Sequence, residues 1–237
     1  MNPLTQAEIS NRILASLPET EFAALRSKLE KRKLHQGDVL ELAGSQAKYI
    51  YFVENGLISL LAPLKQGGRM EIGHVGPEGA AGVHAVLGAD IATSEIMGQS
   101  EGWVYRAEVS AVRALLEKLR GLRDALVQFA NALHVQVAQT AACNGTHDVT
   151  QRLARWLLMA HDRIGSDTLG LTHETISLML GVTRPGVTIS AGVLQKQGLI
   201  QYSRGKLTIV DRAGLEQAAC ECYGIVEAYC KTELGTH

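Results

Sequence analysis

The chain has 237 residues, with 23 Lys and Arg against 24 Asp and Glu, which gives a formal net charge of −1. Its 46% hydrophobic and 20% charged residues are typical of a soluble globular protein with one large or two small domains, and they exclude a disordered or collagen-like chain. Aromatic residues make up only 5%, which argues against a stacking platform for single-stranded nucleic acid. The near-zero charge taken alone disfavours a nucleic-acid partner, but a whole-chain sum hides local patches.

We expect a cytoplasmic protein that has no membrane partner. The first ten residues lack the basic flank and apolar run of a signal peptide, and the apolar runs elsewhere are far shorter than the roughly 20 residues that span a bilayer. Four cysteines are present, none of them in the first 142 residues. This distribution gives no disulfide framework and fits reduced thiols.

The first half of the chain predicts a short helix followed by a small β-domain. Residues 19–30 place Phe22, Leu25 and Leu29 at helical spacing. From about 33 to 106, short apolar runs alternate with glycine-containing turns, which predicts an antiparallel β-barrel or sandwich. The expected strands are 39–42, 49–53, 57–61, 70–75, 95–97 and 103–106.

From Ser110 the pattern is helical, and a helix over about 121–143 is its main element. One stripe of this helix repeats at alternating steps of four and three residues, the spacing of a coiled-coil seam: Leu122, Leu126, Phe129, Leu133, Gln136, Thr140 and Cys143. We expect this stripe to form a homodimer interface. The alternative is that it packs against the chain's own β-domain. Asn144-Gly145 should end the helix, and we place the domain boundary there, with domains 1–145 and 146–237.

Residues 172–197 have the pattern of a helix-turn-helix. Thr172 can cap a first helix, Gly181 stands where the chain needs a positive φ, and Thr183 can cap a second helix that has Pro185 in its first turn. In a helix-turn-helix of this kind, the second helix lies in the DNA major groove. The alternative interpretation is an ordinary helical hairpin in a protein core.

A two-stranded hairpin follows over 198–211, and its charged turn resembles the wing of a winged helix. Arg184 is the best candidate to read a base, because its planar guanidinium can pair with guanine O6 and N7. Residues 172–212 carry a net charge of +3 and the remainder −4, so the basic surface is confined to one end. The expected DNA-binding residues are Thr172, His173, Thr183, Arg184, Thr188, Lys196, Ser203, Arg204 and Lys206.

With these motifs in this order, the chain resembles the Crp/Fnr family of bacterial transcription regulators over nearly its whole length. Asp148-Val-Thr-Gln-Arg152 opens the second domain as in the family, and Leu171 through Ile200 follows the family's helix-turn-helix spacing without a gap. The resemblance implies an α+β fold: an N-terminal cyclic-nucleotide-binding-like β-roll, a long dimerisation helix and a C-terminal winged helix-turn-helix. It also implies a homodimer on a palindromic double-stranded DNA operator, with RNA polymerase as a further partner.

The departures from the family pattern concern the effector. Cyclic-AMP receptors hold ribose and phosphate with a Gly-Glu pair and an Arg-Ser pair. At these places this chain has Gly82-Val83 and Thr93-Ser94. The receptors read adenine with a Thr-Ser pair, and this chain has Val137-Ala138 there. We therefore expect no cyclic AMP and no required cofactor. In the second helix, Pro185 and Ile189 replace a Glu and an Arg of the family, so the operator need not match the family consensus.

One alternative function remains, a metal- or thiol-redox-responsive sensor. Cys143 and His147 are four residues apart, and Cys220-Glu-Cys222 lies 73 residues after His147. Thiolates and an imidazole can bind zinc if the fold brings them together, whereas a buried structural role is the simpler interpretation, and we assign no metal ligand. An enzyme is not expected, since no phosphate loop, nucleophile elbow or HExxH motif is present.

Overall fold

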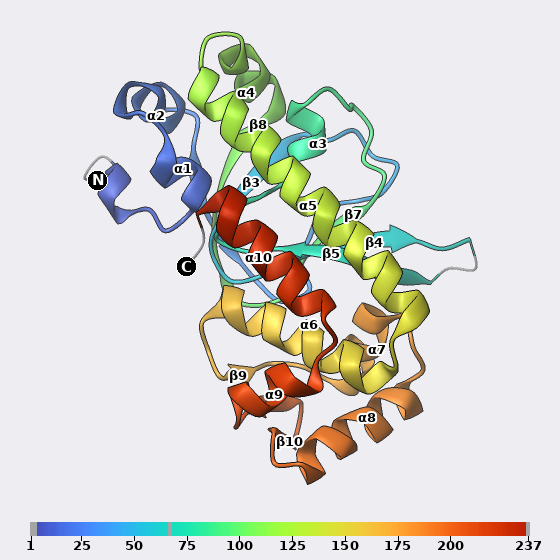
Figure 1. Cartoon of the computed structure of the whole chain (residues 1–237). Coiled ribbons are helices and arrows are strands. Elements are labelled where there is room, and N and C mark those ends of the chain that lie inside the picture. Colours follow the sequence, from blue (N-terminus) through green and yellow to red (C-terminus); the bar gives the residue numbers. More distant parts are fainter. Residues whose placement is uncertain (1–3, 66–67, 236–237) are drawn as a thin grey trace.

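The computed structural model describes residues 4–65 and 68–235. The N-terminal part is a β-roll with short helices beside it, the long helix α5 (Arg120–Thr146) crosses the molecule, and a smaller domain of helices and short strands follows (Figure 1). The expected α+β architecture is therefore confirmed. No single helix in the described ranges is long and apolar enough to cross a membrane. One bent pair, α7 (His173–Leu180) and α8 (Arg184–Lys196), which meet at 104°, has the length and composition for it.

The first part of the chain holds the helices and strands of the roll together with α5. The helices are η1 (Gln6–Glu8), α1 (Arg12–Ser16), α2 (Glu19–Arg26), α3 (Val83–Val86), α4 (Val109–Leu116) and α5 (Arg120–Thr146). The strands are β1 (Glu30–Leu34), β2 (Val39–Glu41), β3 (Tyr49–Asn55), β4 (Ile58–Pro63), β5 (Arg69–Val75), β6 (Ala80–Ala81), β7 (Glu95–Gly98) and β8 (Gly102–Glu108). The second part contains α6 (Val149–Ile164), β9 (Thr168–Leu169), α7 (His173–Leu180), α8 (Arg184–Lys196), β10 (Ile200–Ser203), β11 (Lys206–Ile209), α9 (Arg212–Ala218) and α10 (Cys222–Leu234).

The roll consists of two antiparallel four-stranded sheets, in the orders β1-β8-β3-β6 and β2-β7-β4-β5. All six expected strands are present. A glycine is required in the turn between β3 and β4, because Gly56 has φ +92° and a Cβ there would lie 2.8 Å from the Glu101 carbonyl oxygen.

Two expected boundaries were wrong. The helix expected over 19–30 ends at Arg26, and Glu30 instead begins β1. Leu34 is the only buried residue of β1, so the sequence of this strand shows no alternation of apolar and polar residues. Pairing with β8 makes this segment a strand. The long helix does not end at Asn144-Gly145 but continues to Thr146, where the His147 backbone becomes extended. Gly145 has open space around it, and its cost of about 1 kcal/mol is tolerated.

The next helix, α6, begins at Val149, and Asp148 is its N-cap. The Asp148 carboxylate accepts hydrogen bonds from the Thr150 and Gln151 backbone N–H groups, and the Gln151 side chain completes a capping box. The His147 bend therefore separates two continuous helices. The division of the chain into domains 1–145 and 146–237 stays a prediction.

The apolar core of the second domain extends into the roll. It includes Leu57, Leu61 and Met97 of the roll together with side chains of α6, α7 and α8 such as Leu157 and Ile176. A separate core fills the roll itself and packs against α5. The second domain is thus docked on the roll through buried apolar contacts.

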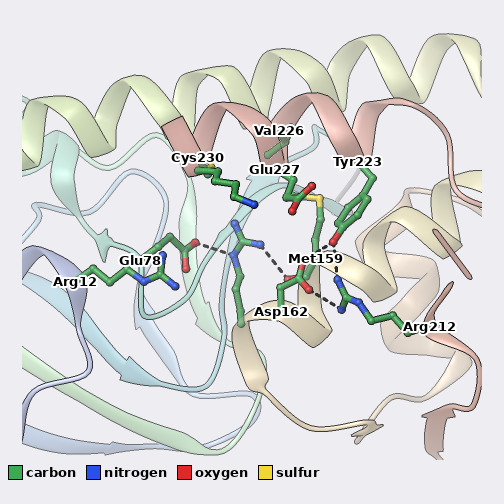
Figure 2. A pocket seen from close by; sticks show the side chains of 11 residues that line it. Arg12, Glu78, Met159, Asp162, Arg212, Tyr223, Val226, Glu227 and Cys230 are labelled. Carbon is green, nitrogen blue, oxygen red and sulfur yellow. Dashed lines mark hydrogen bonds and ion pairs between the residues drawn. The ribbon is translucent and has the colours of Figure 1, made fainter. Parts of the chain in front are cut away.

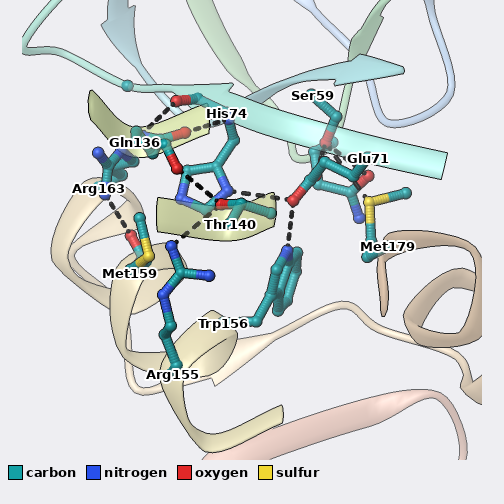
Figure 3. Close-up of polar contacts among 12 residues, drawn as sticks. Ser59, Glu71, His74, Gln136, Thr140, Arg155, Trp156, Met159, Arg163 and Met179 are labelled. Atoms are coloured by element: carbon teal, nitrogen blue, oxygen red, sulfur yellow. Dashed lines mark hydrogen bonds and ion pairs between the residues drawn. The ribbon is translucent and has the colours of Figure 1, made fainter. Parts of the chain in front are cut away.

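Buried polar groups cross the same boundary (Figure 3). The Glu71 carboxylate of β5 accepts hydrogen bonds from the Ser59 hydroxyl at 2.5 Å and from the Trp156 indole N–H of α6 at 2.6 Å, and its Oε1 lies 3.2 Å from His74 Nδ1. Burial lowers the pKa of His74, with a contribution from the Arg163 charge, so this imidazole is neutral at pH 7. These three partners satisfy a carboxylate that has almost no access to water.

A cavity of about 260 Å³ lies between the N-terminal segment, α6, α9 and α10 (Figure 2). Ion pairs occupy its walls: Arg163 Nε is 2.7 Å from Glu78 Oε1, and Arg212 Nη1 is 2.7 Å from Asp162 Oδ1. Burial opposes ionisation of Glu78, but the Arg163 charge and the backbone hydrogen bonds to this carboxylate together outweigh burial and lower the pKa of Glu78. The Glu78–Arg163 ion pair joins the roll to α6 at this cavity.

Candidate nucleic-acid interface

α7 and α8 form the expected helix-turn-helix. The Thr172 hydroxyl accepts a hydrogen bond from the Thr175 backbone N–H at 3.0 Å and begins α7, and Gly181 ends it in the left-handed conformation with φ +62°. Thr183 then caps α8, whose second residue is Pro185. Local sequence therefore sets the end of α7, the start of α8 and the 104° angle between these helices.

α8 buries one face and exposes the other. Val187, Ser190, Ala191 and Leu194 pack into the domain core. The outer face carries the exposed residues Arg184, Pro185, Thr188, Ile189, Gly192, Val193 and Lys196. Ile189 is 69% exposed although it is a large apolar side chain, and it stands beside Thr188 on the face that would enter a major groove. This face combines cations at its two ends with apolar groups between them.

The hairpin of β10 and β11 forms the expected wing, and β9 adds a third strand to its sheet. Its turn is tight because Arg204 and Gly205 both have positive φ, +48° and +78°. Ser203, Arg204 and Lys206 are exposed at this tip. In the part of the chain that the structure describes, neither Arg204, Lys206, Arg184 nor Lys196 forms an ion pair with a carboxylate.

His173 lies behind this surface and connects its parts. Its Nδ1 is 3.0 Å from the Thr188 hydroxyl of α8, and its ring stacks on Tyr202 of the wing with centroids 4.4 Å apart. Burial, with the Arg184 charge, lowers the pKa of His173. The Thr188 hydroxyl also donates to the Arg184 carbonyl oxygen at 3.1 Å. The half-buried His173 therefore supports α8 and the wing, and Tyr202 is a supporting residue that the sequence did not single out.

The wing tip and the start of α7 border a cleft of about 730 Å³ whose other wall is the roll. Thr172, Arg204 and Lys206 line one side, and Gln36 and Arg69 line the other. The roll also touches the helix-turn-helix directly, because a Cβ on Gly181 would lie 2.3 Å from Met70 Sδ. One flank of the candidate DNA surface thus adjoins the roll.

The stripe of α5 that we expected to pair two chains packs largely within one chain. Leu122, Leu126 and Phe129 are buried in the core of the roll. Gln136 is buried too, accepting from the His74 backbone N–H at 2.7 Å, while Leu133 and Thr140 are half-buried. A heptad stripe needs a partner surface, and here the chain's own roll covers the buried Leu122, Leu126, Phe129 and Gln136, while Leu133 and Thr140 stay partly exposed.

A different stripe of α5 is exposed. It has the same alternation of four and three residues, shifted around the helix: Val127, Asn131, His134, Ala138, Ala141 and Gly145. On its other flank, α10 lies alongside α5 (Figure 1), with the Gln128 side chain donating to the Glu233 carbonyl oxygen. The exposed stripe is therefore the face of α5 that neither the roll nor α10 covers.

Gly82-Val83, which the resemblance compares with the receptors' Gly-Glu pair, lies in a closely packed part of the roll, whereas Thr93 is exposed. Gly82 has φ +88° and precedes α3, and Val83 is buried. At Gly73 of β5, an added Cβ would lie 2.9 Å from Gln136 Oε1 and 3.4 Å from Val137 Cγ2. α5 thus lies directly on the strand at this point.

The structure brings together the four cysteine and histidine candidates. Cys143 and His147 at the end of α5 meet Cys220 and Cys222 at the turn between α9 and α10. All three cysteines are buried, and they form a small cluster apart from the two main cores. The sequence could not show this, because 73 residues separate His147 from Cys220.

Comparison with known proteins identifies the class of protein to which the chain belongs. Residues 31–119 match the profile of the cyclic nucleotide-binding domain, and residues 151–218 match that of the Crp-like helix-turn-helix domain. The chain is similar to the transcriptional regulators SdrP (27% identity; 71% of this chain, 83% of the relative) and LdrP (25%; 79% and 96%) of Thermus thermophilus. Among solved structures, FixK2 of Bradyrhizobium japonicum has a TM-score of 0.70 at 15% identity, covering 81% of this chain and 98% of the other.

Fold, domain order and site together define a transcription regulator with a cyclic-nucleotide-binding-type roll and a helix-turn-helix DNA-binding domain. A CRP-family transcriptional regulator of Thermus thermophilus has the same architecture, with a TM-score of 0.66 at 23% identity over 79% of this chain and 96% of the other. The chain belongs to the Crp/Fnr family, whose members are regulators and not enzymes.

Proposed function

We propose that this protein is a sequence-specific regulator that binds a palindromic operator as a homodimer in the cytoplasm, with RNA polymerase as a further partner. The observation that carries the proposal is the exposed face of α8, with Arg184 at its N-terminal end and the wing cations Arg204 and Lys206 nearby. The N-terminal end of such a helix reaches base edges, while a wing reaches phosphates.

The composition of α8 suggests how the bases are read. Arg184 supplies the donor pair for a guanine, and the exposed Ile189 and the Thr188 methyl group supply apolar contacts for thymine methyls. Thr172, Thr183 and Ser203 add hydroxyls for phosphates, and Lys196 adds a charge at the far end of α8. In this proposal His173 acts through Thr188 and Tyr202, which it contacts.

The homodimer would use the exposed stripe of α5. Ala138, Ala141 and Gly145 let two helices approach closely, and Val127 adds an apolar contact at the other end of the stripe. Two helix-turn-helix units related by a two-fold axis would then read half-sites about 34 Å apart, one helical turn of DNA.

Control by cyclic AMP in the manner of its receptors is not part of the proposal. The chain has Val83 and Thr93 in place of the carboxylate and the arginine that hold ribose and phosphate. The close approach of Gln136 and Val137 to Gly73 also disfavours cyclic AMP binding in the manner of the receptors, because α5 lies directly against β5 at this point.

Selection of bound DNA from a random pool, followed by fluorescence anisotropy at fixed salt, tests the proposal. We expect a palindromic sequence, and Arg184→Ala should lower the preference for it over a single-base variant by about 10-fold or more, equivalent to about 1–3 kcal/mol. Lys118→Ala is a matched control, since this exposed cation lies on the loop between α4 and α5. Unchanged discrimination in Arg184→Ala would refute its role as a base reader.

A further inference from the structure

Four side chains with metal-binding atoms converge where the end of α5 meets the turn between α9 and α10. One ligand atom each of Cys143, His147, Cys220 and Cys222 lies within 4.8 Å of all the others. The Sγ atoms of Cys143 and Cys220 are 3.4 Å apart, and Cys222 Sγ is 3.6 Å from His147 Nδ1. Two segments distant in sequence thus direct their donor atoms to one small volume.

These distances fit a single tetrahedral zinc ion. Zinc–sulfur bonds of about 2.3 Å and zinc–nitrogen bonds of about 2.0–2.1 Å at tetrahedral angles put neighbouring ligand atoms about 3.5–3.8 Å apart. Three thiolates and one imidazole are also a common donor set for structural zinc, and soft thiolate ligands favour zinc over magnesium or calcium. Four protein ligands leave no open position, so the site is of the structural kind.

The histidine is oriented as a zinc ligand would be. His147 directs Nδ1 toward Cys222 and places Nε2 3.2 Å from Glu221 Oε2. Metal-bound histidines commonly donate their other ring N–H to a carboxylate, which fixes the tautomer. The Thr146 hydroxyl lies 3.2 Å from Nδ1, but it donates its proton to the Ala142 carbonyl oxygen and leaves the Nδ1 lone pair free.

Two cations beside the cluster, one buried and one half-buried, offset the negative charge of such a site. Zinc with three thiolates and a neutral imidazole carries a net charge of −1. Arg152 and Arg155 of α6 lie near these cysteines, and the Nε atom of each is buried without a hydrogen-bond partner. Neither arginine forms an ion pair with a carboxylate in the described ranges. Gln139 Nε2 also donates to Cys222 Sγ at 3.0 Å.

We propose that Cys143, His147, Cys220 and Cys222 bind one zinc ion, which joins the end of α5 to α9 and α10. On binding, zinc forms bonds to three sulfurs and one nitrogen, and the three thiols release three protons, so the step is balanced without a redox partner. The bound ion would hold α10 against α5 at the His147 bend. This inference goes beyond the proposed function, since it needs no DNA.

Metal analysis of the purified full-length chain tests the proposal. After expression with zinc, reducing purification and gel filtration, we expect one zinc per chain by inductively coupled plasma mass spectrometry. Cys143→Ser and Cys222→Ser should lose it. Cys230→Ser is the matched control and should keep it, since Cys230 is a half-buried cysteine that lines the separate cavity of Figure 2. Glu221→Gln should keep the stoichiometry but weaken zinc binding about 10-fold.

A second measurement does not depend on variants. Cobalt(II) added to the reduced, metal-free wild-type chain should give the visible d–d bands of a tetrahedral thiolate site, and zinc should abolish them. Wild-type protein that retains no zinc and gives no such bands would overturn the proposal. A Cys143–Cys220 disulfide in freshly isolated protein, seen by intact mass under non-reducing conditions, would overturn it as well, and so would equal zinc loss in Cys230→Ser and Cys222→Ser.

Discussion

The indole N–H of Trp156, in the DNA-binding domain, donates a hydrogen bond to the buried Glu71 carboxylate of the roll, with 2.6 Å between Nε1 and Oε1. This bond joins residues 85 positions apart and lies inside the molecule. Because the carboxylate is only 4% exposed and water can hardly replace a lost donor, its hydrogen bonds couple the two parts of the chain.

Trp156→Phe should therefore destabilise the protein by about 1–3 kcal/mol, because it leaves one Glu71 oxygen short of a donor. Urea unfolding followed by circular dichroism measures the change. Trp103→Phe is the control, since Trp103 is 40% exposed and should shift the midpoint little. Equal midpoints for wild type and Trp156→Phe would show that the bond does not stabilise the folded state.

The buried His74 predicts a pH dependence of stability. Burial lowers the pKa of His74 below its ordinary 6.5, so the unfolded chain binds this proton more readily than the folded chain. The resulting stability is fully present above about pH 6.5 and is lost as the pH falls below it, at up to about 1.4 kcal/mol per pH unit for one group. His74→Gln should flatten the dependence of the unfolding free energy between about pH 7.5 and about pH 5.5.

The exposed His134 provides the matching control, and His134→Gln should leave the pH profile as in wild type. An unchanged slope in His74→Gln would assign the acid sensitivity to other groups. The Arg163 charge and backbone hydrogen bonds together lower the pKa of Glu78 despite burial, so its contribution to stability is lost as the pH falls through its folded-state pKa.

Lys206→Ala should weaken operator binding by a similar factor for all sequences. Lys206 lies at the wing tip, where a cation contacts phosphates and releases counterions. The slope of log K against log salt should fall by about 2, about 1 for each protomer of the homodimer, since both protomers carry the change. An unchanged slope in anisotropy titrations from about 50 to about 200 mM salt, the range in which such effects are large, would exclude a phosphate contact by Lys206.

Ala138→Asp should dissociate the homodimer, because it puts a charge in the middle of the exposed stripe of α5 and opposite its symmetry mate. Sedimentation velocity should show a dimer for wild type and a monomer for this variant, with an unchanged circular dichroism spectrum. Ala228→Asp, on the exposed side of α10, should remain a dimer. A dimer that persists in Ala138→Asp would place the interface elsewhere.

Local signals in the sequence predicted much of this fold, but not the contacts between its parts. Thr172, Gly181 and Thr183 set the helix-turn-helix, since caps and positive φ act within a few residues. The stripe through Leu122 and Phe129 showed that one face of α5 is buried, but its spacing could not distinguish the chain's own roll from a second chain. The polar β1 was missed because only pairing with β8 makes it a strand.

The long-range groups gave no local signal either. Glu71 and Trp156, or Cys143 and Cys220, meet only because α6 docks on the roll and α10 returns along α5. Hydrophobic periodicity places each helix on a core but does not give its orientation relative to a distant strand.

The apolar core of the second domain, which includes Leu57, Leu61 and Met97 of the roll, affects how the molecule unfolds. Neither half can open without exposing side chains that the other half covers, so heat should melt them together, in a single calorimetric transition. The fragment beginning at Asp148 would present this uncovered apolar surface to water and should self-associate. The helix-turn-helix of this chain is therefore not an exchangeable module, and a chimaera that keeps it must keep the facing sheet of the roll.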